Sequence, residues 1–316
     1  MARRVAVVFG GTGFIGRYVV QRLAHADYVV RVVTRAPETA RPLMTQGLVG
    51  QIVPFQSGPL DDAHVAAAVA SATVVVNTIG ILAERREGDF ARIQGALPGR
   101  IGRAAAAAGV QRVVHISAIG ADPASPSLYA RSKAEGEAAL RSAFPGATIL
   151  RPSIVFGPED GFFNRFAGMA RLLPFLPVVG GGTRFQPVYV GDVADAVLAA
   201  LERGEAAGGT YELGGPRAVT FRALMEEMLD IIGRRRRVVE LPEGLARFQA
   251  KLTSWMPNPP LTEDQLLLLK RDNAVSEGAR GLRDLGVEPT TMEAILPAYL
   301  GRFRRGGQRQ ISVPTS

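Results

Sequence analysis

Short runs of apolar residues alternate with helical patterns through the first half of the chain. The strand-like runs are continuous in Val and Ile, which is typical of strands buried on both faces of a sheet. They cover residues 3–10, 28–35, 51–56, 72–80, 111–120 and 147–157. Helical patterns separate them, at residues 14–24, 37–46 and 61–70, in an alanine-rich stretch that ends at Gly109, and again before residue 147. This alternation predicts an α/β fold with a doubly wound parallel sheet.

The pattern changes after about residue 157. Residues 172–190 are rich in Pro and Gly and predict loops around short strands, whereas residues 191–204 and 220–233 have the spacing of amphipathic helices. We expect these segments to form a smaller lobe over the carboxyl edge of the sheet. The expected division is a sheet domain over residues 1–157, a smaller C-terminal α/β lobe over 158–301 with some segments that return to the core, and a basic, mobile tail over 302–316.

Composition excludes several kinds of site. The 316 residues include no cysteine, so disulfides and thiolate chemistry are excluded, and His25, His64 and His115 lack the spacing of metal ligands. No apolar run approaches the ~20 residues that span a bilayer, and no signal peptide pattern precedes the first strand. These features predict a cytoplasmic protein without a metal site.

The net charge is +8, and nearly all of the basic residues are arginine. Such a bias is typical of genomic base composition, and the alternative is a basic face for an acidic partner, anionic lipid or nucleic acid. Nucleic acid is not expected, because no aromatic residues are interleaved with the basic run at 234–237.

A turn rich in glycine joins the first strand to the first helix. Glycines here permit a tight turn, let a pyrophosphate approach the backbone N–H groups at the helix N-terminus, and let the helix pack on the strand. The turn therefore predicts a dinucleotide-binding Rossmann domain, against the alternative of a turn that binds nothing. The predicted cofactor contacts in this turn are Gly10, Thr12, Gly13, Phe14, Ile15 and Gly16.

The second strand ends in Thr34 and Arg35, with no acidic residue. A carboxylate at this place accepts a hydrogen bond from the ribose of NAD, whereas a guanidinium pairs with the 2′-phosphate of NADP. We therefore expect NADPH as the cofactor, and the alternative is that Arg35 is a solvated loop residue. After the third strand, the expected adenine contact is the backbone near Leu60 or the side chain of Asp61.

Tyr129 and Lys133 are four residues apart at the start of a helix, so their side chains share one face. An ammonium group beside a tyrosine is expected to lower the pKa of the phenol, which can then exchange a proton with an alcohol or carbonyl while the nicotinamide exchanges hydride. The alternative is an ordinary surface pair on a helix.

These motifs resemble the extended and atypical members of the short-chain dehydrogenase/reductase superfamily. The resemblance implies that Ser117 polarises a substrate carbonyl, that Tyr129 is the acid/base, and that Lys133 supports both and holds the nicotinamide ribose. It also implies cofactor contacts after the fourth and sixth strands, at Asn77, Ile79, Gly80, Pro152, Ser153 and Ile154. Only 11 residues separate Ser117 from Tyr129. Epimerase-like members have a longer insert that helps to build the substrate site, so these catalytic residues are expected to be vestigial.

A narrower resemblance covers nearly the whole chain. Residues 127–167, with the run PEDGFFNRFA, residues 186–197 and the C-terminal LTEDQLLLLKRDNAV are similar to the nucleotide-binding accessory subunits of respiratory complex I. The resemblance implies a tightly held NADPH, a structural role in the peripheral arm near the membrane, and the other complex I subunits as partners. The lack of a transit peptide implies a bacterial counterpart, peripheral on the cytoplasmic face of the inner membrane.

Residues 243–257 carry an apolar face, with Leu245, Phe248, Leu252 and Trp255 at helical spacing. Such a helix can lie on a membrane interface or a partner, or pack on its own domain. The four arginines at 234–237 can cap the preceding helix, meet acidic phospholipid or remain solvated.

Three functions therefore remain. The first is a structural, NADPH-binding accessory subunit of complex I. The second is a free NADPH-dependent reductase, epimerase or dehydratase that acts on a small carbonyl or sugar-nucleotide substrate. The third is a sensor of the NADPH/NADP⁺ ratio.

Overall fold

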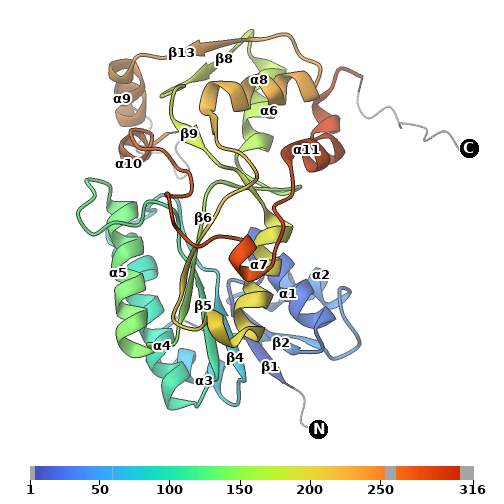
Figure 1. Ribbon diagram of the computed structural model, residues 1–316, viewed down its shortest axis with the longest axis vertical. Coiled ribbons are helices and arrows are strands. Elements are labelled where there is room, and N and C mark those ends of the chain that lie inside the picture. Colours follow the sequence, from blue (N-terminus) through green and yellow to red (C-terminus); the bar gives the residue numbers. More distant parts are fainter. Residues whose placement is uncertain (1–3, 59, 253–260, 307–316) are drawn as a thin grey trace, which may run out of the picture.

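The computed structural model describes residues 4–58, 60–252 and 261–306. Seven parallel strands form the central sheet, in the order β11-β6-β5-β4-β1-β2-β3, which confirms the predicted fold class (Figure 1). The strands are β1 (Val5–Phe9), β2 (Val29–Thr34), β3 (Ile52–Gln56), β4 (Val74–Asn77), β5 (Arg112–Ile116), β6 (Thr148–Pro152) and β11 (Thr210–Leu213). The order reverses direction between β1 and β4, which is where open α/β sheets bind ligands at their carboxyl edge.

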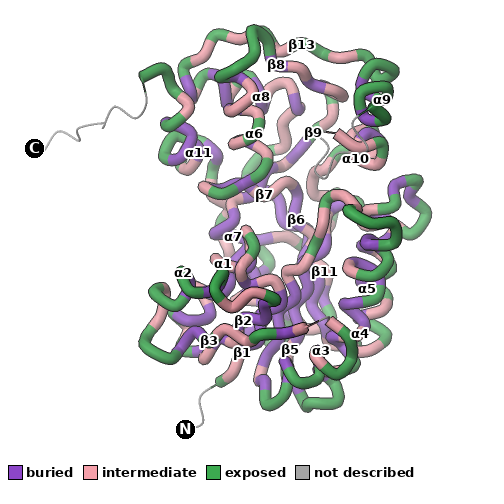
Figure 2. Tube along the Cα trace, turned by 180° about the vertical axis from the view of Figure 1, so that it is seen from behind, coloured by how far each residue is buried: buried purple, intermediate pink, exposed green. Residues whose placement is uncertain are grey.

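Helices cover both faces of this sheet. Apolar side chains of α1 (Phe14–His25) and α7 (Val190–Glu202) pack on one face, and those of α3 (Asp62–Val69), α4 (Leu97–Ala107) and α5 (Leu128–Ala143) pack on the other. Figure 2 shows the resulting band of buried residues along the strands, with the exposed residues on the outer helices. Burial on both faces explains the continuous Val runs of these strands.

The second half of the chain forms a lobe above the carboxyl edge of the sheet (Figure 1). Its core lies among α6 (Phe163–Leu172), α8 (Phe221–Ile231) and α11 (Met292–Leu300). Small two-stranded sheets complete it: β8 (Phe175–Val178) with β13 (Arg237–Glu240), β9 (Arg184–Phe185) with β12 (Val219–Thr220), and β7 (Val155–Phe156) with β10 (Val188–Tyr189). The helices α9 (Glu243–Leu252) and α10 (Glu263–Leu268) pack together on one side.

Three elements differ in detail from what the sequence predicts, although a short helix near 37–46 and a helix that ends before Gly109 are both present. The helix expected over 37–46 is a 3₁₀ turn, Pro37–Ala40, followed by a single turn, α2 (Arg41–Met44), because Pro37 and Pro42 each fit only the first turn of a helix. The alanine-rich helix begins as a π-helix, Phe90–Ala96. Residues 191–204, expected in the smaller lobe, form most of α7, which packs against α1 on the sheet and is buried on nearly all sides.

Two further expectations concern residues outside the described chain. One is Trp255, which was expected on the apolar face of residues 243–257. The other is the basic tail, of which residues 307–316 lie outside the described chain. Among the residues that the structure describes, no helix is both long and apolar enough to cross a bilayer.

Candidate functional site: the carboxyl edge of the sheet

The turn between β1 and α1 leaves no space for side chains. Gly10 has a φ of +79°, and a Cβ there would lie 2.8 Å from the Thr78 hydroxyl oxygen. A Cβ on Gly16 would collide with the carbonyl oxygen of Gly10, so α1 packs on the turn only because residue 16 is glycine. Gly13 is the N-cap residue, with its N–H bonded to the Gly10 carbonyl at 2.9 Å. No side chain caps α1, and its first turn carries no acidic residue, so the helix N-terminus suits a pyrophosphate.

A carboxylate from the C-terminal half flanks this turn. Glu159 accepts a hydrogen bond from the Tyr18 hydroxyl at 2.8 Å and lies 3.4 Å from the Arg17 guanidinium. Arg17 also donates to the carbonyl of Gly13 at 3.3 Å. Glu159 thus connects the loop after β7 to α1 and balances the positive charge of Arg17.

The end of β2 presents a free guanidinium. Arg35 is exposed and makes no hydrogen bond or ion pair within the described part of the chain. The hydroxyl of Thr34 accepts from the Ala36 N–H at 3.2 Å, which fixes the turn that carries Arg35. The side chain of Arg35 therefore remains available for an anionic group, as expected for a 2′-phosphate site.

Beyond β3, Asp61 is already engaged. Its carboxylate caps α3 by accepting from the His64 N–H at 2.9 Å, and it also contacts the His64 ring at 2.7 Å. The Leu60 carbonyl is engaged as well, because it accepts from Arg100. The adenine contact near Leu60 or at Asp61 stays a prediction. Ser57, which the sequence analysis did not single out, is buried beside this loop with an unpartnered hydroxyl.

Asn77, at the end of β4, organises the next loop. Its Oδ1 accepts from the Ile79 N–H at 3.1 Å, and its Nδ2 lies 3.1 Å from Nδ1 of His115, so this ring nitrogen is the acceptor. His115 is buried, with Nε2 unpartnered. Burial, together with the nearby charge of Lys133, lowers the pKa of His115 to about 3. A neutral imidazole therefore lies beneath the site.

Lys133 joins β5 to α5. Its buried ammonium donates to the Ile116 carbonyl at 3.2 Å and lies 5.9 Å from the centre of the Tyr129 ring. Burial lowers the pKa of Lys133 to about 8. Ser117 follows on β5, buried and with an unpartnered hydroxyl, which fits a side chain that waits for a ligand. Lys133 thus lies beside Tyr129 and binds the backbone of the residue that precedes Ser117.

The prediction that Lys133 lowers the pKa of Tyr129 is wrong. Burial and the charge of Asp264 raise the pKa of Tyr129 to about 12, and Lys133 does not offset them. The ring packs edge-on against Phe90, at 5.9 Å between centroids, and the residue is half-buried. Tyr129 is therefore a weak acid in this structure.

Asp264 is a contact that the sequence analysis missed. It lies in the first turn of α10, yet its carboxylate accepts from the Ser127 hydroxyl at 2.8 Å, the Leu128 N–H at 2.6 Å and the Tyr129 N–H at 3.2 Å. The spacing T-x-x-Q, which forms a capping box at Thr262 and Gln265, marks the start of α10 but does not reveal what Asp264 reaches.

At the end of β6, Ser153 is likewise engaged by the C-terminal half. Its hydroxyl lies within 2.8 Å of two oxygens of Asn273, the backbone carbonyl and the side-chain Oδ1. Pro152 and Ser153 are buried and Ile154 is half-buried. The predicted nicotinamide segment is therefore attached, through Ser153, to a residue that follows α10.

Because the strands are parallel, every predicted site residue lies at or next to one edge of the sheet. The residues at strand ends are Thr34 and Arg35 (β2), Asn77, Ile79 and Gly80 (β4), Ser117 (β5), and Pro152, Ser153 and Ile154 (β6). Tyr129 and Lys133 lie in the first two turns of α5. The Arg35 guanidinium and the Ser117 hydroxyl have no partner in the described chain, and α1 begins without a side-chain cap above a glycine turn. These features fit a bound dinucleotide.

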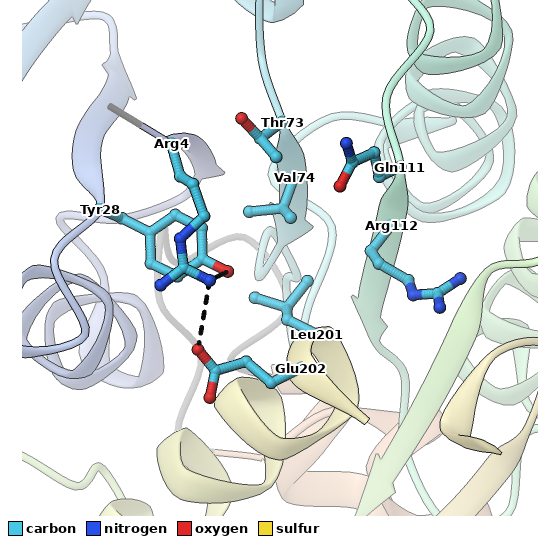
Figure 3. Close-up of a pocket in the computed structure, with 8 residues that line it drawn as sticks. All are labelled: Arg4, Tyr28, Thr73, Val74, Gln111, Arg112, Leu201 and Glu202. Atoms are coloured by element: carbon cyan, nitrogen blue, oxygen red, sulfur yellow. Dashed lines mark hydrogen bonds and ion pairs between the residues drawn. The ribbon is translucent and has the colours of Figure 1, made fainter. Parts of the chain in front are cut away.

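A cavity of about 510 Å³ lies at the opposite edge, where β1, β4 and β5 begin (Figure 3). Arg4 lies over the ring of Tyr28, with its guanidinium 4.1 Å from the ring centre, and pairs with Glu202 at 3.6 Å. This cavity is separate from the predicted cofactor residues, so it does not bear on the dinucleotide site.

Comparison with known proteins identifies a family, several relatives and similar solved structures. Residues 6–214 match the model of the NAD dependent epimerase/dehydratase family. "NADH dehydrogenase [ubiquinone] 1 alpha subcomplex subunit 9, mitochondrial" of Arabidopsis thaliana is 39% identical over 96% of this chain and 79% of its own. "Ceramide reductase" of Caulobacter vibrioides is 31% identical over 80% of this chain and 79% of its own. In fold, the chain is similar to an NADPH-dependent quinone oxidoreductase, QOR2 of Escherichia coli, with a TM-score of 0.73 and 20% identity. The match covers 93% of this chain and 98% of that structure.

Proposed function

This chain belongs to the NAD dependent epimerase/dehydratase family, and we propose that within the family it is an NADPH-binding, structural accessory subunit of respiratory complex I. The observation that carries the proposal is the extent of the similarity. The family model stops at residue 214, whereas the similarity to the plant subunit covers 96% of the chain. The similarity to a complex I subunit therefore extends through the C-terminal lobe, beyond the residues that the family model matches.

The site supports a cofactor that is held rather than turned over. The glycine turn and α1 would hold the pyrophosphate, Arg35 the 2′-phosphate, and Lys133 the nicotinamide ribose. When bound, NADPH would supply a hydride to any carbonyl beside it. However, the raised pKa of Tyr129 makes its phenol a weaker proton donor than a free tyrosine, and the Ser153 hydroxyl is already hydrogen-bonded to Asn273. A ligand that binds the folded chain alone stabilises it by mass action, which is the role proposed for the nucleotide.

The partners that we propose are the peripheral-arm and membrane-proximal subunits of the complex, at the cytoplasmic face of a bacterial inner membrane. Helix α9 supports this placement. Ala246 and Ala250 pack inward against Leu266, whereas Leu245, Phe248 and Leu252 remain 54 to 64% exposed. An exposed apolar face of this kind suits a partner subunit or an anionic lipid surface.

The test is purification of complex I after gentle solubilisation. We expect the chain in the intact complex, with close to one NADP(H) released per chain on denaturation. An intact complex that lacks the chain, or a chain that carries no nucleotide, would contradict the proposal.

A second function is favoured by one observation, the placement of Lys133 beside Ser117 and Tyr129, together with the similarity to a ceramide reductase. A free reductase would oxidise its bound NADPH with a carbonyl compound from a test panel. Loss of that oxidation in Tyr129→Phe would assign the reaction to this site, whereas no oxidation by any carbonyl supports the structural role.

A further inference from the structure

Arginines from three separate segments meet at the end of the C-terminal lobe that lies farthest from the sheet (Figure 1). They come from the end of α6, from the loop that joins α8 to β13, and from the chain that follows α11. We call them the arginine cluster, and its members are Arg171, Arg234, Arg235, Arg236, Arg304 and Arg305.

Helix ends hold half of the cluster in place. Three of the arginines each donate from Nε to a backbone carbonyl at or near the end of a helical segment. The pairs are Arg234 with Phe303 at 2.8 Å, Arg236 with Ala170 at 3.2 Å and Arg304 with Ile231 at 2.9 Å. A guanidinium group has five N–H donors, so these bonds leave most of the donors of each group free.

No carboxylate balances the arginine cluster. Among the described residues, none of its six guanidinium groups forms an ion pair, whereas Arg217 in the same lobe pairs with two glutamates. Burial and the charges of three neighbouring arginines lower the pKa of Arg234. Like charges repel one another at such a surface, so a bound anion would relieve the repulsion and stabilise the folded lobe.

A hollow of about 450 Å³ opens beside the cluster. It is bordered by residues 233–236 and by the side of α8 that carries Glu226 and Asp230. Neither of these carboxylates pairs with an arginine within the described part of the chain, and three arginines share the border with them. The hollow therefore offers guanidinium donors and space to a phosphate group.

Exposed apolar side chains flank the cluster. Leu172 is 82% exposed and Phe175 is 42% exposed, and both come just after Arg171 in sequence. Phe175 on β8 lies across from Arg237 on β13, which adds another exposed arginine to this edge. Apolar side chains beside guanidinium groups suit the boundary between phospholipid headgroups and acyl chains, whereas a soluble phosphate needs the guanidinium groups alone.

We propose that the arginine cluster and its apolar flank bind the surface of an anionic phospholipid bilayer. Guanidinium groups bind phosphate oxygens through paired N–H donors, and every basic residue at a membrane surface adds to the affinity. The inference rests on the proposed function, which places the chain at a membrane, and it adds the lipid class and the side chains that bind it. Strand β13 joins the cluster to α9 in sequence, so two lipid contacts flank one strand.

The test is cosedimentation of the full-length chain with vesicles. One set is phosphatidylcholine alone, and in the other about a third of the lipid is phosphatidylglycerol. We expect binding to the anionic set and little to the neutral set. The triple variant Arg171→Gln, Arg235→Gln, Arg305→Gln keeps the three helix-end bonds. It should weaken binding on the order of 100-fold, since each basic residue contributes about fivefold.

The matched control is the triple variant Arg41→Gln, Arg85→Gln, Arg86→Gln. It lowers the net charge equally, through exposed arginines of the sheet half whose side chains have no partner in the described chain. An equal loss of binding in this control, or equal binding of the wild type to neutral and anionic vesicles, would overturn the proposal. Circular dichroism verifies that all variants are folded.

A further variant separates a bilayer from a soluble phosphate. Leu172→Ser should weaken binding to anionic vesicles about tenfold, because the side chain loses its burial among lipid. Leu48→Ser, at a position of the sheet half that is 72% exposed, should leave binding unchanged. Unchanged binding in Leu172→Ser, or displacement by inorganic phosphate at constant ionic strength, would assign the cluster to a soluble anion and overturn the bilayer proposal.

The vesicle experiment uses the isolated chain, so its failure differs from a failure of the proposed function. A chain that is absent from complex I but binds anionic vesicles through the arginine cluster would contradict the subunit assignment alone. A chain that is present in complex I, with vesicle binding unaffected by the triple cluster variant, would overturn the lipid site alone.

Discussion

Asp160 and Tyr299 meet inside the C-terminal lobe, where the Tyr299 hydroxyl donates a hydrogen bond to the buried Asp160 carboxylate. Asp160 also accepts from the N–H groups of Phe162 and Phe163, so one side chain caps α6 and attaches α11 to it. Asp160 comes from the PEDGFFNRFA run, so this run has a packing role within the lobe.

Replacement of this pair should destabilise the protein unequally. Tyr299→Phe removes one hydrogen bond and should lower the free energy of unfolding by about 1–2 kcal/mol, whereas Asp160→Ala also leaves buried N–H groups unpaired and should cost ~3 kcal/mol or more. Urea unfolding of both single variants and the double variant measures the coupling. Strict additivity would show that the contact contributes nothing.

The buried His115 should make the protein acid-sensitive. Its pKa is about 3 when folded and near 6.5 in the unfolded chain, so between these values only the unfolded state takes up the proton. Stability from this group is present above pH 6.5 and is lost as the pH falls toward 3, by on the order of 3 kcal/mol at about pH 4. Urea unfolding across this range should show a shallower loss in His115→Gln, and parallel curves would contradict the assignment.

Gly16→Ala should weaken binding of the dinucleotide, because the added methyl group meets the Gly10 carbonyl and displaces α1 from the turn. Overpacking of this kind costs about 1–3 kcal/mol, so we expect binding to weaken ~10-fold or more. Gly168→Ala is the control, since it also lies within a helix but has open space at the Cβ position. Calorimetric titration with NADPH compares the two variants, and equal affinities would refute the steric argument.

Arg35→Ala should weaken NADPH about 10- to 100-fold and leave NADH nearly unchanged, because the guanidinium is proposed to pair with the 2′-phosphate alone. Arg41→Ala, another exposed arginine without a partner in the described chain, controls for the loss of charge. If Arg35→Ala weakens both nucleotides equally, the preference for NADPH has another origin.

Phe248→Glu should leave the unfolding free energy within about 0.5 kcal/mol of the wild type, since the ring is 64% exposed. The same change should reduce cosedimentation with vesicles that contain anionic lipid. The inward-facing Ala250→Glu is the contrast: it should destabilise the packing of α9 on α10. Unchanged sedimentation of Phe248→Glu would exclude this face of α9 as a lipid contact.

Whether a feature could be predicted depended on how far apart in sequence its interacting residues lie. The glycine turn, the strand ends and the Tyr129–Lys133 pair are local patterns, and the structure places them at one edge as parallel strands require. The contacts of Asp264 and Asn273 join residues more than 100 positions apart, and no local pattern indicates them. For that reason the sequence suggested an acidic Tyr129, whereas burial and a distant carboxylate make it a weak acid.

Helix α7 was misplaced for a different reason. Its alanines, including Ala194, Ala196 and Ala200, are buried together with its valines, whereas its three acidic residues share the remaining side. The small side chains allow close approach to α1. The pattern predicts one buried face, but it does not indicate whether that face packs on the sheet or within the lobe.

The position of β11 affects how the chain can fold during synthesis. β11 adds to the sheet beside β6, and α7 covers the sheet next to α1, although both follow β6 in sequence by a long excursion through the lobe. A nascent chain that ends near residue 157 has an open β6 edge and an uncovered apolar face, a state prone to aggregation. Residues through Leu213 must therefore be synthesised before the sheet of the nucleotide-binding half can be completed. Folding of that half thus depends on the part of the lobe that precedes α7 in sequence.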